Sequence, residues 1–142
     1  MKKLILSLFI IPLSGRAGFN SQYTNSTVLL EVRSGEWPIS LEKTTTDRQN
    51  AYFLQFRDQH VLTGMSLDTL PFADLIQLKY FEKALSALKN GTNGDIAKFK
   101  DYSVKRTESR KDGRWYILRY QWGLTNFQQH EADTLISTIR RL

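Results

Sequence analysis

Alternating apolar and polar residues mark extended segments in the first half of the chain. Residues 28–33, 37–42 and 51–57 each alternate with a period of two. This period is typical of strands that bury one side. In the third segment, the uniformly apolar side consists of Tyr52, Leu54 and Phe56. The pattern predicts three strands, and we expect the second to lie at a sheet edge because Pro38 lacks a backbone donor.

Two amphipathic helices are predicted from apolar residues that recur three and four positions apart. The first covers residues 70–90, with Pro71 in its first turn and Gly91 as the left-handed residue that ends it. The second begins at Thr125, which forms a weak capping box with Gln128. Its predicted buried stripe is Ala132, Leu135, Ile136, Ile139 and Leu142.

A hairpin is predicted between the two helices. Residues 102–110 and 114–122 flank an Asp112-Gly113 pair, which is typical of a two-residue turn. This turn pairs Arg110 with Trp115, Glu108 with Ile117, and Arg106 with Arg119. Because Tyr116, Leu118, Tyr120 and Trp122 make the better core side, we expect the arginines and Trp115 to share the exposed side.

The predicted fold class is α+β. The element order is β-β-β-α-β-β-α, and the simplest arrangement is an antiparallel sheet of about five strands with two amphipathic helices on one face. The pattern of residues 52–57 resembles that of residues 115–120, and each segment precedes a helix. A sheet followed by a helix, used twice, is similar to single-strand nucleic-acid-binding folds of the PC4 and Whirly type, by element order and without a shared motif.

The first residues are typical of a secretory signal. Lys2 and Lys3 precede a mostly apolar run over residues 4–13 and a small-residue segment that ends at Ala17. An apolar run of about ten residues suits a signal core and is too short to span a bilayer. We predict a signal peptide over residues 1–17 and a single domain over residues 18–142. The alternative is that this run is a buried strand or helix of the finished fold.

Charge and cysteine content narrow the function only slightly. The chain carries 20 basic and 14 acidic residues, and loss of Lys2, Lys3 and Arg16 with the signal lowers the net charge from +6 to +3. A domain this mildly basic is not identified as a nucleic-acid binder by charge alone. The absence of cysteine excludes disulfides, thiolate metal sites and a cysteine nucleophile.

No pattern indicates catalysis. The two histidines are His60 and His130, and His130 shares a helix face with Asp133. Two ligands make a poor metal site, and no nucleophile elbow, phosphate-binding loop or dinucleotide fingerprint is present. We therefore expect no catalytic residue, no metal and no cofactor.

The sequence favours a binding function. The candidate surface is Arg106, Arg110, Arg114, Trp115 and Arg119. Together with the signal peptide, this surface predicts an exported protein, periplasmic or secreted, that is not an enzyme. Its expected role is that of an inhibitor or interaction module, and its expected partner is another protein. The alternative is a cytoplasmic single-stranded nucleic-acid-binding domain that uses the basic and aromatic hairpin.

Overall fold

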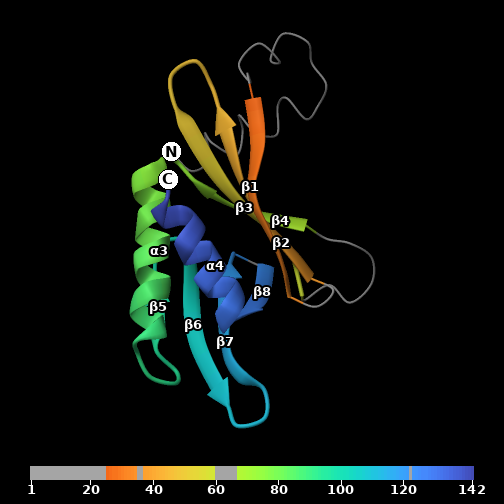
Figure 1. Ribbon diagram of the computed structural model, residues 1–142, viewed down its shortest axis with the longest axis vertical. Coiled ribbons are helices and arrows are strands. Elements are labelled where there is room, and N and C mark those ends of the chain that lie inside the picture. The colour runs from red at the N-terminus through yellow and green to blue at the C-terminus, as the bar shows by residue number, and fades with distance from the viewer. Residues whose placement is uncertain (1–24, 35–36, 60–66, 122) are drawn as a thin grey trace.

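The chain folds into two four-stranded antiparallel sheets, each followed by a helix. The computed structural model describes residues 25–34, 37–59, 67–121 and 123–142. Sheet A consists of β1 (Asn25–Ser34), β2 (Trp37–Thr45), β3 (Asn50–Arg57) and β4 (Leu67–Phe72), and is followed by helix α3 (Leu75–Lys89) (Figure 1). Sheet B consists of β5 (Ile96–Lys98), β6 (Tyr102–Ser109), β7 (Gly113–Tyr120) and β8 (Gly123–Gln128), and is followed by helix α4 (Gln129–Arg140). The fold is therefore α+β.

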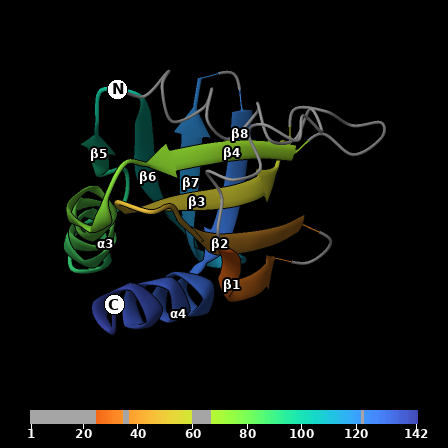
Figure 2. The ribbon, with the colours of Figure 1, turned by 90° about the horizontal axis from the view of Figure 1, so that it is seen from above.

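The two sheets lie face to face, and their strands cross at a steep angle (Figure 2). The helices lie side by side along one flank of this pair. Lys89 at the end of α3 forms an ion pair with Asp133 in the first half of α4, at 2.8 Å. Lys79 in the first half of α3 donates to the carbonyl of Ile139 near the end of α4, at 2.7 Å. The two helices are therefore antiparallel.

One continuous core joins both sheets and both helices. The inner sides of the strands contribute equivalent cross-strand rows in the two halves: Lys43, Tyr52 and Phe72 in sheet A, and Arg106, Tyr116 and Phe127 in sheet B. The repeated order predicted for the two halves is present, but the matched positions are shifted by one, because Tyr52 corresponds to Tyr116 and not to Trp115. The predicted inner side of β3 is confirmed, since Tyr52, Leu54 and Phe56 are all buried.

The prediction of one sheet of about five strands is wrong, because it missed three short strands, and the strands form two sheets. Residues 67–72 form β4 instead of opening the first helix, with Leu70 and Phe72 turned into the core. Helix α3 starts later, where the Asp74 side chain accepts from the backbone N–H of Gln77 at 2.9 Å. Pro71 is tolerated because β4 is at the edge of sheet A.

The other two missed strands are β5 and β8. β5 has only three residues, and it lies in a segment whose sequence is typical of a linker. β8 contains Thr125, which is fully buried within the strand and does not cap a helix. The capping box of α4 instead joins Gln128 and Glu131, whose carboxylate accepts from the Gln128 N–H at 2.8 Å.

Three smaller predictions are also wrong. β2, which contains Pro38, lies between β1 and β3, and the proline is accommodated because the pairing with β3 begins one residue later, at Ile39. Gly91 is not left-handed; its lack of a Cβ leaves room for the Asp95 carboxylate. Leu142 is 40% exposed, whereas the other four residues of the predicted α4 stripe are buried.

Three predictions lie outside the described residues: the signal peptide over residues 1–17, the environment of His60 and the core position of Trp122. Within the part of the chain that the structure describes, no helix has the length and apolar character needed to cross a membrane.

Candidate functional site

The β6–β7 hairpin has a different register from the predicted one. Ser109 pairs with Gly113, and Thr107 pairs with Trp115, so the turn spans residues 110–112. Gly113 takes a left-handed conformation with φ of 75°, and Ser109 Oγ accepts from the Asp112 N–H at 2.9 Å. The observed pairing is offset by three residues from the predicted one. An odd offset turns every side chain of one strand to the opposite face.

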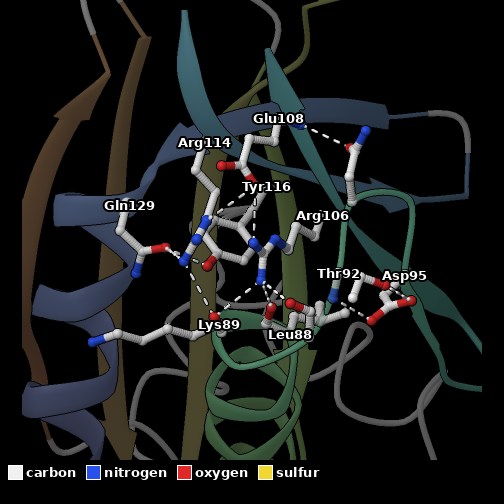
Figure 3. A network of polar contacts seen from close by, with 11 residues as sticks. Leu88, Lys89, Thr92, Asp95, Arg106, Glu108, Arg114, Tyr116 and Gln129 are labelled. Carbon is white, nitrogen blue, oxygen red and sulfur yellow. Dashed lines mark hydrogen bonds and ion pairs between the residues drawn. The ribbon is translucent and has the colours of Figure 1, made fainter. Parts of the chain in front are cut away.

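Arg106 consequently points inward and is only 5% exposed. Its Nη1 donates to the carbonyls of Leu88 and Lys89, each at 3.0 Å, and to that of Gly91 (Figure 3). Its Nη2 forms an ion pair with Glu108 at 2.9 Å. The Leu88 and Lys89 carbonyls belong to the last turn of α3, where carbonyls lack partners further along the helix and a cation is favoured by the helix dipole, and Gly91 follows directly after the C-cap Asn90. Arg106 therefore caps α3.

Arg114 joins the same network (Figure 3). Its Nη1 donates to the Lys89 carbonyl at 3.1 Å and to Gln129 Oε1 at 3.3 Å, and its Nε lies 3.7 Å from Glu108. The Tyr116 hydroxyl donates to the same Gln129 oxygen. The hydrogen bond from Arg106, together with the nearby charge of Arg114, lowers the pKa of Glu108. The network connects the end of α3, the hairpin and the start of α4.

The predicted candidate surface is therefore divided. Arg106 and Arg114 hold helices together, Arg110 is exposed in the turn, and only Trp115 and Arg119 lie on the outer side of sheet B. The expectation that Arg106, Arg110, Arg119 and Trp115 share one exposed side is wrong, and the reason is the register.

The outer side of sheet B instead presents a cationic and apolar surface, which we call the basic face. Cross-strand pairing assigns to it Ile96, Lys98, Ser103, Lys105, Thr107, Trp115, Ile117, Arg119, Leu124, Asn126 and Gln128. It holds three cations and no carboxylate. The corresponding side of sheet A carries Glu31 and Glu42.

The three cations of the basic face are available to a ligand. Lys98, Lys105 and Arg119 are exposed, and among the described residues none of them forms an ion pair or a hydrogen bond. Ile117 is half-buried opposite Lys105, and the half-buried Trp115 lies two residues further along β7 toward the turn. Alternation along β6 places Lys105 on the side opposite Arg106. Which of these two sides faces outward follows only from the register of the hairpin.

A hollow of about 330 Å³ opens at the turn end of the basic face. Its lining consists of Thr107, Glu108, Ser109, Asp112, Trp115, Ile117 and Asn126. The Trp115 indole N–H donates to the Asp112 carbonyl at 2.8 Å, which fixes the ring relative to the turn. A volume of this size suits one planar ring of a small ligand.

No metal centre is found among the described residues, since no group of three or more His, Asp or Glu side chains comes together there. His130 is exposed in the first turn of α4. Asp58 and Asp68 interact electrostatically, and burial, aided by the charge of Asp58, raises the pKa of Asp68.

No protein-family model matches this chain, and no curated protein is significantly similar to it in sequence.

Proposed function

We propose that this protein binds single-stranded nucleic acid through the basic face of sheet B. The observation that carries the proposal is the set of three cations, Lys98, Lys105 and Arg119, on the same side of sheet B as the half-buried Trp115. Among the described residues these side chains have no ion-pair partner, and the strands of sheet B place no carboxylate on this side. Cations pair with phosphates, and an exposed aromatic ring stacks on unpaired bases.

A single strand fits this face better than a duplex does. The bases of a duplex are stacked on one another, and a protein reads them with an element that enters a groove. Here both helices pack against the core on the inner side of the sheet, so neither helix covers the basic face. The order of four strands and a helix, used twice, also keeps the similarity to PC4 and Whirly-type folds that was noted from the sequence.

Three variants test the proposal by fluorescence anisotropy with a labelled oligothymidylate. Lys105→Gln and Arg119→Gln remove cations from the basic face. Lys83→Gln removes an exposed cation from α3 and serves as the matched control. We expect each of the first two to weaken binding severalfold at low salt and to reduce the slope of log K against log salt by about 0.7 per lost phosphate contact.

The control should leave both the affinity and the slope unchanged. Equal affinity of all three variants and the unmodified protein would contradict the proposal. So would an absence of oligothymidylate binding at low salt. Export and protein binding stay sequence-based predictions, because residues 1–17 lie outside the described part of the chain.

A further inference from the structure

We infer that the hollow beside Trp115 is a pocket for a single base and that it prefers guanine. This inference rests on the proposed function, because the pocket lies at one end of the basic face, and its Trp115 is four residues along β7 from Arg119. A strand whose phosphates contact the cations of that face can place one base over the turn.

The pocket is built before any ligand arrives. The indole of Trp115 is held by its hydrogen bond to the Asp112 carbonyl at 2.8 Å. Ser109 Oγ accepts from the Asp112 N–H and also lies 3.4 Å from the Asp112 carboxylate, so the turn and its acid are held together. A ring that is already ordered loses little side-chain entropy when a base stacks on it.

The polar groups of the pocket favour one pattern of base donors and acceptors. The Asp112 carboxylate can only accept hydrogen bonds. The Asn126 oxygen already accepts from Gln59 Nε2 at 3.3 Å, which leaves the Asn126 amide N–H groups as donors. The pocket therefore presents an acceptor that can take two bonds, and a separate donor.

Guanine has the complementary edge. Its N1–H and its amino group are adjacent donors that suit one carboxylate, and its O6 beside them is an acceptor that suits an amide N–H. Adenine and cytosine offer an amino group next to an unprotonated ring nitrogen, which a carboxylate repels. Thymine presents two carbonyl oxygens, and at least one of them would face Asp112. A two-bond contact of this kind discriminates between bases by an amount typical of specific readout.

Glu108 does not reverse this preference. Its Oε2 is shared by Arg106 and Arg114 at 2.9 and 3.7 Å, so its charge is compensated within the network. The nearest uncompensated carboxylate in the lining is that of Asp112, which is exposed. A phosphate chain can therefore approach from the side of Lys105 without crossing an unpaired acid.

The experiment compares short oligothymidylates that carry one central guanosine, adenosine, cytidine or inosine. We expect the guanosine oligomer to bind about 10-fold more tightly than the all-thymidine oligomer. Inosine lacks the amino group of guanosine and should lose most of that gain. Asp112→Asn should abolish the preference, so that this variant binds the guanosine and the all-thymidine oligomers with equal affinity; the amide keeps the size of the side chain.

Asn126→Asp is a second variant that keeps the size of the side chain and removes the donor. It should also lose the preference for guanosine. A guanosine oligomer that binds no better than the all-thymidine oligomer would overturn the pocket and leave the proposed function standing. Failure of every oligomer to bind would overturn both.

Discussion

Lys105 and Arg106 are adjacent in sequence and have opposite environments. Lys105 is exposed on the basic face, whereas Arg106 is 5% exposed and donates to three carbonyls at the end of α3. Removal of a buried group that satisfies several others leaves those others unpaired, and this costs more than the loss of a surface charge.

This contrast predicts different stability changes for two matched variants. Arg106→Gln should lower the free energy of unfolding by about 2–4 kcal/mol. Lys105→Gln should change it by no more than about 0.5 kcal/mol. Urea denaturation followed by circular dichroism measures both. Equal denaturation midpoints would mean that Arg106 does not cap α3.

Asp68 predicts an unusual dependence of stability on pH. Its pKa is raised by burial and by the charge of Asp58, so the folded state disfavours its ionised form. The unfolded chain ionises at the ordinary carboxyl pKa, and the folded chain only at a higher pH. Stability contributed by this group is therefore present below the ordinary pKa and is lost as pH rises towards the raised value.

Asp68→Asn removes the loss of stability that accompanies ionisation of Asp68. The variant should melt at a higher temperature than the unmodified protein at pH ~7, and the difference should shrink as the pH falls below the ordinary carboxyl pKa of about 4. Differential scanning fluorimetry across this range makes the comparison. A variant that is less stable at neutral pH would show that the carboxylate has a stabilising partner instead.

Among the secondary-structure elements, the β6–β7 hairpin has the largest effect on the candidate site. Its register is set by the three-residue turn over residues 110–112 and by Gly113, the first residue of β7, whose φ is 75°. A residue with a Cβ is strained in this left-handed conformation. The turn therefore needs glycine at this position, and the same turn places Lys105 and Trp115 on one side of the sheet.

Gly113→Ala tests the conformation of the turn. Nothing lies within 4 Å of a Cβ built at this position, so the substitution changes backbone strain without a clash. We expect a loss of about 1–2 kcal/mol of unfolding free energy, measured by thermal or urea denaturation. An unchanged midpoint would indicate that the turn has another conformation in solution.

In the whole molecule, the two sheet-and-helix halves are stabilised by one shared core. The cluster of buried residues includes Leu54 from sheet A, Leu118 from sheet B, Phe81 from α3 and Leu135 from α4, all fully buried. A cavity in one half therefore removes contacts from the other. Cooperative unfolding in a single step is the expected behaviour of a domain of this size.

Leu54→Ala tests this cooperation. The substitution should cost about 2–5 kcal/mol. Hydrogen exchange of the slowest backbone amides should speed up by the same factor in β7 as in β3, because both are exposed by the same global opening. Faster exchange confined to sheet A would show that the halves unfold separately.

Several features of this protein could be read from local patterns. The inner side of β3, the inner side of β7 and the buried stripes of α3 and α4 follow from periods of two and 3.6 residues. The repeated order of strands and helix also follows from these two periods. Periodicity is a property of neighbouring residues, and it identifies which side of an element is buried without any knowledge of its partner.

The remaining features were decided by tertiary contacts. β5 and β8 are strands because they pair with β6 and β7, and their own sequences are too short or too polar to show it. The side of the sheet on which Arg106 or Lys105 lies depended on a turn only one residue longer than the predicted one. Pairing register joins residues that are distant in sequence, so the chain's own pattern determined the core, while contacts across the fold determined the basic face.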